Sequence, residues 1–245
     1  MQYIIAFLRL SMIMPQKQGI KVLSMDTSTP RGSVALLHGE EVSGELRLAS
    51  LETHSSRLLK SVDFLLETAS WKLNDLNLVA AGIGPGSFTG IRIGVATALG
   101  LAQTLGIPFA GVSGMDALVS QNLFLRGKIA VIMDAQRSQV YYAEYINNEG
   151  RIRSAVRPLL LFPAELERRL RRKKIFLIGD GACRYFSRFG TARSDRSQFV
   201  MTDLFIAAGI GRLALKRKSS WKTGTELQSE PLYIRPPDAA KSKKR

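Results

Sequence analysis

Cysteine, histidine and acidic residues are all scarce in this chain. Its 245 residues include one cysteine and two histidines, and 35 Lys and Arg stand against only 20 Asp and Glu. A single thiol excludes an internal disulfide and fits a reducing compartment. Neither His38 nor His54 lies near Cys183 in the sequence, so we expect a small buried thiol rather than a nucleophile. The two histidines also give no Ser–His–Asp arrangement.

Long apolar runs are missing as well. The apolar run near the N-terminus covers only residues 3–8, which is too short to cross a bilayer. It has neither the basic flank nor the cleavage site of a signal peptide. We therefore predict a soluble, cytoplasmic protein without membrane contact, and we treat residues 1–19 as an N-terminal extension outside the fold.

Positive charge is what the chain has in excess, with a formal net charge of +15 at pH 7. Such a balance favours attraction to polyanions such as RNA or an anionic membrane surface. This attraction is non-specific and says nothing about the fold. Hydrophobic residues make up 45% of the chain, which is ordinary for a globular protein, and the length fits one large or two small domains.

The first half of the chain alternates strand and helix patterns. Short apolar runs ended by turn residues predict strands at 20–25, 33–37, 42–48, 78–83 and 108–112. Apolar residues at helical spacing predict helices at 54–69 and 89–105. This order of elements predicts a mixed sheet with helical crossovers.

The second half repeats the alternation. Strands are predicted at 129–133, 140–146 and 175–178, and helices at 163–173 and 202–216. The fold class is therefore α/β, with two lobes that each hold a mixed sheet flanked by helices. We place the boundary near Ser113, which assigns 20–112 to the N-terminal lobe, 113–230 to the second lobe and 231–245 to a basic C-terminal tail.

The glycine-rich segment 82–90 lies between a predicted strand and a predicted helix, where phosphate-binding loops occur. A Walker loop needs a lysine that reaches the phosphates, and no lysine lies between Lys72 and Lys128. The dinucleotide fingerprint fails too, because position 89 is not glycine. A tight strand-to-helix turn is the better interpretation, and weak anion binding at the helix start stays open.

The predicted helix at 89–105 carries Gly90, Gly94, Ala98 and Ala102 at four-residue spacing, which forms a ridge of minimal side chains. Few of its other residues are polar, so it should be covered on more than one side. The ridge either packs inside the chain against the helix at 54–69, or both helices present an apolar surface to a partner chain. The candidate interface residues are His54, Ser55, Leu58, Leu59, Val62, Leu66, Thr89, Gly90, Ile91, Gly94, Val95 and Ala98.

A metal centre on the first predicted helix is not expected. His54 would need a second ligand three or four residues further on. Those positions hold Arg57 and Leu58, so the usual helical metal signature is not present.

Two aspartates, Asp26 and Asp134, end predicted strands. Open α/β sheets bind ligands at the carboxyl ends of strands, and similar placement in two lobes suggests a duplicated nucleotide cleft. Asp and Gly are also common turn residues, so both interpretations stay open. The candidate nucleotide-binding residues are Asp26, Ser28, Asp134, Gly179, Asp180 and Gly181. The candidate ligand is ATP or ADP, in the interlobe cleft or at a partner interface.

The densest basic cluster lies in and after the helix predicted at 163–173. With the lysines of the tail it would steer RNA phosphates, although charge runs of this kind are usually a solvated helix face. The candidate RNA-contact residues are Arg168, Arg169, Arg171, Arg172, Lys173 and Lys174.

Several segments of the chain together resemble the TsaB/YeaZ family. The strongest likeness is in VLSMDTSTPRGSVAL (22–36), ETHSSRLLKSVDFLLE (52–67), GIGPGSFTGIRIGVATALGLAQTLGIPFAGVSGMDAL (82–118) and VIMDAQRSQVYYAEY (131–145). GDGA at 179–182 and PLYIRPPDA at 231–239 resemble later landmarks of the family. The family belongs to the glycoprotease-like branch of the actin/Hsp70/sugar-kinase superfamily, so the resemblance implies a two-lobed actin-like fold.

The resemblance also implies a function. Family members act as non-catalytic scaffolds in forming threonylcarbamoyladenosine on tRNAs that read ANN codons, pair with the catalytic paralogue TsaD, and are joined by the ATPase TsaE. The isolated chain would form a homodimer. TsaD carries two metal-binding histidines at i and i+4 on its first helix, where this chain has His54 and Leu58. A nucleotide-binding ATPase or protease-like enzyme of the same superfamily is the alternative.

This chain departs from the family pattern beside Asp134. Gln136 stands where members more often have arginine, and Ser138 and Gln139 replace a pair of positions that is commonly acidic. The N-terminal extension and the lysine-rich tail also lie outside the pattern.

Overall fold

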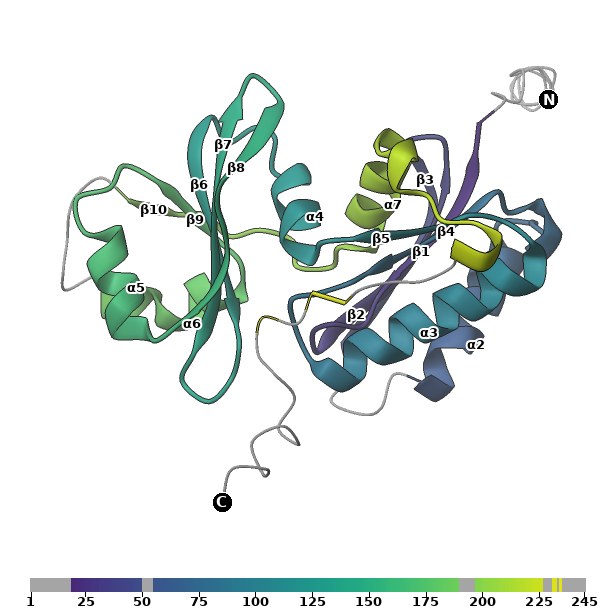
Figure 1. The fold of residues 1–245 in the computed structure, drawn as a ribbon, viewed down its shortest axis with the longest axis horizontal. Helices are drawn as coiled ribbons and strands as arrows, with labels where there is room; N and C mark the ends of the chain where they lie inside the picture. Colours follow the sequence, from purple (N-terminus) through teal and green to yellow (C-terminus); the bar gives the residue numbers. More distant parts are fainter. Residues whose placement is uncertain (1–18, 50–54, 190–196, 227–230, 233, 235–245) are drawn as a thin grey trace, which may run out of the picture.

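The protein consists of two α/β lobes, each built on a five-stranded mixed sheet (Figure 1). The computed structural model describes residues 19–49, 55–189, 197–226, 231, 232 and 234. The predicted fold class is confirmed. The predicted extension and nearly all of the basic tail lie outside the described residues.

The first sheet has the strand order β3-β2-β1-β4-β5. Its strands are β1 (Lys21–Asp26), β2 (Arg31–His38), β3 (Glu41–Ala49), β4 (Leu78–Gly82) and β5 (Phe109–Val112). Strands β1, β2 and β3 pair antiparallel, whereas β1, β4 and β5 run parallel. Tight turns connect the antiparallel strands, and helical crossovers connect the parallel ones, as the alternation of patterns predicts.

The second sheet repeats this topology with the order β8-β7-β6-β9-β10. Its strands are β6 (Gly127–Asp134), β7 (Val140–Asn148), β8 (Arg151–Leu161), β9 (Phe176–Ile178) and β10 (Gln198–Phe199). Again the first three pair antiparallel, and β6, β9 and β10 run parallel. Asp26 and Asp134 are therefore the last residues of equivalent strands.

Helices cover both faces of each sheet (Figure 1). They are α2 (Ser55–Thr68), α3 (Phe88–Leu105), α4 (Gly114–Ser120), α5 (Pro163–Leu170), α6 (Asp180–Phe189) and α7 (Ala207–Lys216), with short 3-10 turns at Leu73–Asp75, Lys218–Ser220 and Gly224–Glu226. Helices α2 and α3 share a core with one face of the first sheet, and α5 and α6 with the outer face of the second. Helices α4 and α7 join both sheets in a central core.

Helix α7 packs against the first sheet, although its residues come from the segment that we assign to the second lobe. Ser24 Oγ in β1 donates a hydrogen bond to Ala207 O over 2.8 Å, and Ala207 N donates to Ser33 Oγ in β2 over 3.1 Å. The lobe boundary near Ser113 stays a prediction where the strands are concerned. Helix α7 does not follow it, because α7 comes after Ser113 in the sequence but packs on the sheet of the first lobe.

Two helices are shorter than predicted. The helix expected at 163–173 ends at Leu170 because Arg171 is extended (ψ 125°) and Arg172 is left-handed (φ 63°). The helix expected at 202–216 begins only at Ala207. Helices α4 and α6 and strands β8 and β10 are not among the predicted elements.

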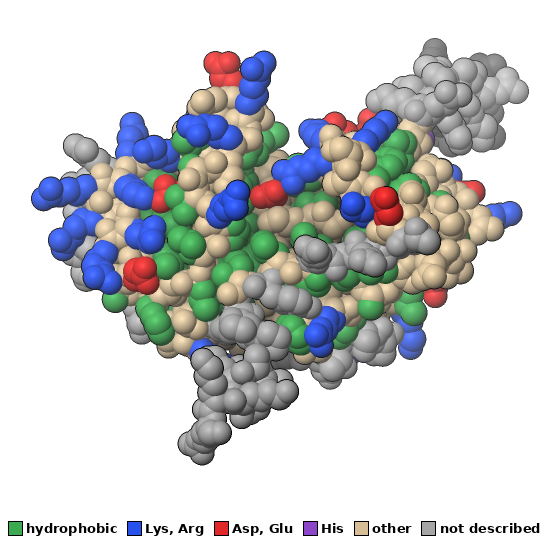
Figure 2. All heavy atoms as spheres, in the orientation of Figure 1, with side chains coloured by type: hydrophobic (Ala, Val, Ile, Leu, Met, Phe, Trp, Pro, Cys, Tyr) green, Lys and Arg blue, Asp and Glu red, His purple; other side chains and the backbone are tan. Residues whose placement is uncertain are grey.

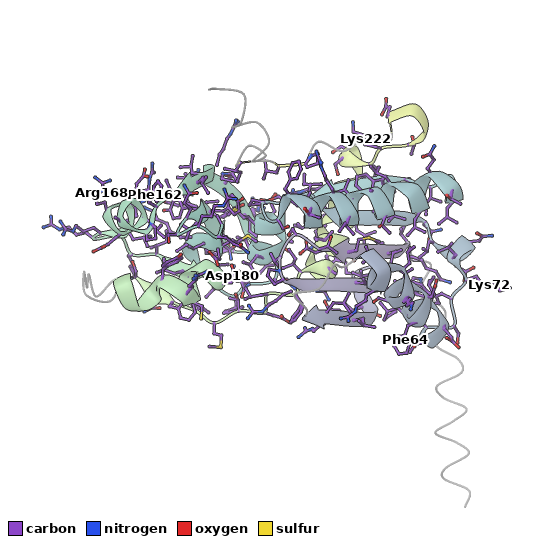
Figure 3. The ribbon with its side chains drawn as sticks, turned by 90° about the horizontal axis from the view of Figure 1, so that it is seen from below. Phe64, Lys72, Phe162, Arg168, Asp180 and Lys222 are labelled. Carbon is purple, nitrogen blue, oxygen red and sulfur yellow. The ribbon has the colours of Figure 1, made fainter. Side chains whose placement is uncertain are left out.

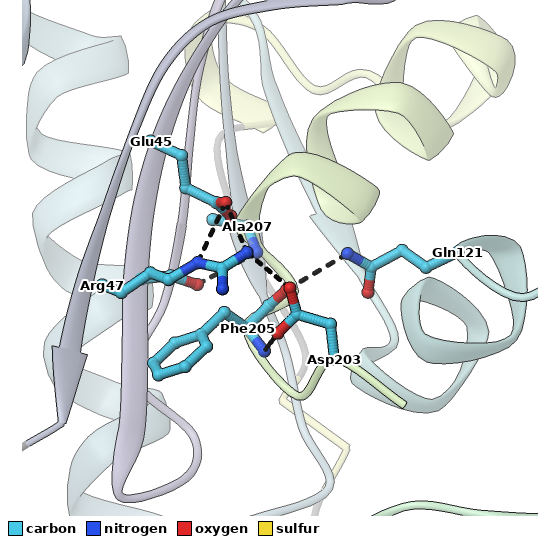
Figure 4. A network of polar contacts seen from close by, with 7 residues as sticks. Glu45, Arg47, Gln121, Asp203, Phe205 and Ala207 are labelled. Carbon is cyan, nitrogen blue, oxygen red and sulfur yellow. Dashed lines mark hydrogen bonds and ion pairs between the residues drawn. The ribbon is translucent and has the colours of Figure 1, made fainter. Parts of the chain in front are cut away.

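A polar network holds the segment before α7 against β3 (Figure 4). Arg47 of β3 forms ion pairs with Glu45 and Asp203, and its guanidinium lies 5.0 Å from the centre of the Phe205 ring. Phe205 N donates to Asp203 Oδ1 over 3.1 Å, and Gln121 Nε2 donates to Phe205 O over 3.1 Å. Because these bonds occupy the backbone of Phe205, they explain why the helix starts late.

Candidate functional site

A cavity of about 270 Å³ lies between the lobes, at the end of β6. It is lined by Thr29, Pro30, Arg31, Gly114, Leu118, Met133, Asp134, Asp180, Arg184, Leu204 and Ile206. Two of the predicted nucleotide-binding residues, Asp134 and Asp180, are therefore brought together, and Asp180 lies near the middle of the molecule (Figure 3). Asp26 and Ser28 are not among the lining residues.

The two aspartates that line the cavity have hydrogen-bond or ion-pair partners within the chain. Asp180 Oδ1 accepts hydrogen bonds from Asp134 N (3.0 Å) and Gly181 N (2.9 Å). Burial raises the pKa of Asp180, and these two N–H groups offset the rise only in part. The carboxylate of Asp134 forms an ion pair with Arg184, which raises the pKa of that guanidinium.

Sequence reasoning missed the two arginines of the cavity. Arg31 begins β2, and Arg184 lies on α6, a helix that is not among those predicted from the sequence. The available signal was the spacing of Ala182 and Tyr185, which are buried on the inner side of α6. Cys183, which follows Ala182 in α6, is exposed, so the expected burial of this thiol is wrong.

The glycines at the start of α6 serve packing rather than ligand approach in this structure. A Cβ at Gly179 would come within 2.3 Å of Ile132 O, and Gly179 has φ +105°. A Cβ at Gly181 would come within 2.7 Å of the carbonyl carbon of Met133. Both glycines therefore allow α6 to lie directly on β6.

Asp26 is sealed beneath the glycine-rich turn. Its side chain is buried, Oδ1 accepts a hydrogen bond from Ser28 N over 3.3 Å, and Oδ2 has no partner. A Cβ at Gly82 would come within 2.2 Å of Oδ1, so only glycine fits above the carboxyl group. Burial raises the pKa of Asp26 to about 6, which the neighbouring Ser28 hydroxyl and amide only partly oppose.

Most of the predicted interface residues are core residues. The buried ones are Leu58, Val62, Leu66, Gly90, Ile91, Gly94, Val95 and Ala98. Leu59 is 49% exposed, and Thr89 is exposed as well. His54 and the side chain of Ser55 lie outside the described residues.

The small-residue ridge of α3 packs inside the chain, but not against α2 at its first two glycines. A Cβ at Gly90 would come within 2.1 Å of Thr27 O, and one at Gly94 within 2.5 Å of Thr27 Oγ1. Thr27 Oγ1 in turn donates to Gly90 O over 2.6 Å. The expected neighbour is thus corrected: the β1–β2 turn, rather than the helix predicted at 54–69, lies against these glycines.

The outward face of α3 is nearly uncharged. Its exposed residues are Thr89, Arg92, Ala96, Gly100, Gln103 and Thr104. Arg92 is the single charged residue of the helix, and its guanidinium lies 3.7 Å from the centre of the Phe88 ring. A Cβ at Gly100 would meet no atom within 4 Å, so this surface has room for a neighbour.

The basic cluster in and after α5 consists of five exposed cations and one half-buried lysine. Arg168, Arg169, Arg171, Arg172 and Lys174 are exposed, and lysines and arginines gather over this lobe (Figure 2). Lys173 instead turns inward and forms an ion pair with Glu144, which also accepts a hydrogen bond from Tyr142. Burial of Glu144 would raise its pKa, but the bonds from Lys173 and Tyr142 outweigh it and lower the pKa.

Among residues 19–49, 55–189 and 197–226, no helix is long and apolar enough to cross a membrane. Within the same described part of the chain, no three His, Cys, Asp or Glu side chains gather in a way that would hold a metal ion.

Two lobes with the same strand order around a central cavity define the class of actin-like proteins. The solved component A of (R)-2-hydroxyglutaryl-CoA dehydratase from Acidaminococcus fermentans superposes with a TM-score of 0.51 over 82% of this chain and 99% of that chain. At 13% sequence identity, this likeness shows the shared fold alone.

Proteins of higher sequence identity identify the family within this class. A family model described as TsaD, tRNA N6-adenosine threonylcarbamoyltransferase, matches residues 48–194. The tRNA threonylcarbamoyladenosine biosynthesis protein TsaB of Buchnera aphidicola is 32% identical over 65% of this chain and 78% of its own length. That of Haemophilus influenzae is 28% identical over 89% and 94%. The solved YeaZ-like protein of Pseudomonas aeruginosa has a TM-score of 0.72 at 29% identity and covers 88% of this chain and 100% of its own. The chain belongs to the TsaB/YeaZ family.

Proposed function

We propose that this chain is a non-catalytic subunit of the complex that adds a threonylcarbamoyl group to adenosine of tRNAs reading ANN codons. Relatives named for tRNA threonylcarbamoyladenosine biosynthesis support the pathway. The observation that carries the non-catalytic role is the burial of Leu58. By the family resemblance, Leu58 corresponds to the second of the two metal-binding histidines of the catalytic paralogue TsaD.

Leu58 is 0% exposed and lies in the same core as Leu23 and Val34 of the first sheet. The face of α2 that would hold a metal in the paralogue is therefore packed against the sheet here. A polar ligand at this position would have to be buried among apolar side chains, which is costly unless it is paired.

The proposed partner is a TsaD-like catalytic paralogue, which would pair with the outward faces of α2 and α3. Leu59 is half exposed, and the exposed face of α3 offers the small residues Ala96 and Gly100 with one charge in the helix. Small, uncharged helix faces allow close helix packing. In the absence of the paralogue the same faces would form a homodimer. A TsaE-like ATPase would join the complex, tRNA would bind through it, and the complex would act in the cytoplasm.

A substitution at Gly94 does not test this interface, because Gly94 is packed against Thr27 inside the chain. The double variant Ala96→Glu, Gly100→Glu places two carboxylates on the outward face of α3 without touching the core. Size-exclusion chromatography with the TsaD-like partner should then show separate chains, with the melting temperature of the variant unchanged.

The matched control is Ala164→Glu, the same change at an exposed position of α5 on the other lobe. It should leave pairing intact. If the double variant still co-elutes with the partner, or if the control dissociates equally, the interface assignment is wrong. If the unmodified chain does not pair with a TsaD-like protein at all, the proposed function itself fails.

A second candidate function is nucleotide binding in the interlobe cavity, as expected for an ATPase or a protease-like enzyme of the superfamily. It is supported by the approach of Arg31 and Arg184 from two lobes to one cavity. Titration of the chain with ADP by calorimetry tests it, with Arg31→Ala as the variant. Binding that is lost in Arg31→Ala, together with ATP turnover by the isolated chain, would favour this candidate.

A further inference from the structure

A second hollow, of about 370 Å³, lies at the opposite end of the second sheet from the interlobe cavity. Its lining residues begin three parallel strands: Arg126, Gly127, Lys128, Lys174, Ile175, Phe176 and Gln198. In register, Ile129 of β6 pairs with Phe176 of β9, which pairs with Gln198 of β10. Asp134, at the cavity between the lobes, ends the eight-residue strand β6 that begins at Gly127, so the two hollows are roughly 20 Å apart.

Three exposed cations surround this hollow, which we call the strand-start pocket. Arg126 and Lys128 stand on either side of Gly127, whose φ of +98° turns the chain as it enters β6. Lys174 stands beside them at the entry to β9. Lys128 lies in β6, Arg126 directly precedes this strand, and Lys174 lies two residues before β9, so the parallel pairing of β6 and β9 brings the three cations around one hollow.

The strand-start pocket carries positive charge that none of its described lining residues neutralises. None of the described residues that line it is acidic. The positive charge of Lys128 helps to lower the pKa of Glu144, but the carboxylate of Glu144 is already bound by Lys173 and Tyr142. Between residues 126 and 178 the sequence has twelve Lys and Arg against five Asp and Glu, so the surrounding surface is basic too (Figure 2).

Besides the three cations, the pocket is lined by an aromatic residue and an amide, which allow contact with a ligand larger than a simple anion. Phe176 is half-buried and contributes an aromatic side chain, and Gln198 contributes an exposed amide. Cations that hold a phosphate next to an aromatic side chain and an amide are the combination with which proteins bind nucleotides of an RNA chain.

We propose that the strand-start pocket binds the phosphate backbone of RNA through Arg126, Lys128 and Lys174. This inference rests on the proposed function, which makes tRNA the substrate of the complex. The exposed arginines of α5 extend the surface, whereas Lys173 takes no part because it serves Glu144.

The test uses the full chain and a fluorescently labelled, unmodified tRNA transcript that reads an ANN codon, with anisotropy measured over a salt series. The variant combines Arg126→Ala, Lys128→Ala and Lys174→Ala. The control, Lys72→Ala, Lys218→Ala and Lys222→Ala, removes the same charge from exposed sites. Lys72 and Lys222 lie away from Arg168 (Figure 3), and Lys218 follows α7, which packs on the first sheet.

We expect the pocket variant to lose about ten-fold or more in affinity and the slope of log K against log salt to fall by about 2–3, as for three lost phosphate contacts. The control should change affinity by less than about two-fold. Equal losses in both variants, an unchanged affinity in the pocket variant, or no tRNA binding by the unmodified chain would overturn the proposal.

A membrane surface is the competing partner of a basic patch. Sedimentation with phosphatidylserine vesicles decides this, because a pocket variant that loses vesicle binding but keeps tRNA binding would also overturn the proposal. Pairing with the TsaD-like partner is measured in parallel. A pocket variant that pairs normally but binds tRNA unchanged refutes the pocket alone, whereas an unmodified chain that fails to pair refutes the proposed function.

Discussion

Asp26 and Asp134 end equivalent strands in two sheets of the same topology, yet only Asp134 reaches the cavity between the lobes. Asp26 is covered by the turn at Gly82, while Asp134 lies beside Arg184 at the cavity wall. The two carboxyl groups therefore occupy the same position in the repeated topology, but Asp26 is buried whereas Asp134 lines a cavity and pairs with an arginine. We expect ionisation of the buried one to carry an electrostatic cost, because a charged carboxylate without a cationic partner is poorly solvated.

Replacement of Asp26 by asparagine should stabilise the protein at neutral pH. The folded-state pKa of about 6 lies above the ordinary aspartate value of 3.8, so the folded state holds the proton of Asp26 more tightly. Stability is therefore lost as pH rises from about 4 to 6, by up to about 3 kcal/mol. Chemical denaturation of Asp26→Asn should show this gain at pH 7.5 and almost none at pH 4.

The control for this prediction is Asp134→Asn, which makes the same change at the equivalent strand end beside an arginine. It should gain no stability at pH 7.5. A gain of similar size in both variants, or a difference between Asp26→Asn and the parent that does not vary with pH, would contradict the argument from burial.

Two glycines of α3 should respond in opposite directions to the same substitution. Gly90→Ala brings a Cβ within 2.1 Å of the backbone oxygen of Thr27, which cannot move freely, so we expect a loss of about 1–3 kcal/mol. Gly100→Ala meets nothing within 4 Å and should gain about 0.5–1 kcal/mol from helix propensity. Thermal denaturation of the two variants in one buffer compares them directly, and equal effects would refute the packing of α3 on the β1–β2 turn.

Lys173 and Lys174 are neighbours with different expected effects on stability. Lys173→Met removes the ion partner of the buried Glu144 and should cost about 1–3 kcal/mol at pH 7. Lys174→Met removes an exposed charge and should change stability by less than about 0.5 kcal/mol.

The pH profile adds a second readout for this pair. Because the pKa of Glu144 is lowered in the folded protein, its contribution is present above the unfolded pKa and is lost as pH falls through the folded one. Urea denaturation at pH 4 and pH 7 should show the Lys173→Met deficit shrinking at the lower pH. A deficit that persists unchanged would refute the ion pair as its cause.

Eight strands, β1 to β7 and β9, and the long helix α3 could be predicted from the sequence because their signals are local. Apolar runs ending at Asp26 and Asp134 mark β1 and β6, and the spacing of small residues marks the buried side of α3. The neighbour of that ridge could not be predicted, because Thr27 lies 63 residues before Gly90 in the chain and meets it only through the sheet.

The parts of the candidate sites that were missed depend on tertiary contacts. Arg31 and Arg184 meet at the cavity because the lobes face each other, which no local pattern encodes. The helix α5 was predicted too long because Arg171 and Arg172 have good helix propensity, and the chain must turn there to reach β9. Arg126 and Lys128 looked like isolated surface cations until the parallel pairing of β6 and β9 placed them beside Lys174.

The return of α7 to the first sheet has a consequence for biosynthesis. Val22, Leu37 and Leu78 share their core with Ile210, so α7, which is made near the end of translation, supplies much of the cover on one face of the first sheet. The N-terminal half emerging from the ribosome therefore exposes an apolar sheet face until residue 216 has been added, and it cannot mature as an independent domain. Truncations and fusions that remove α7 should be read as damage to the first lobe, even though they leave its sequence intact.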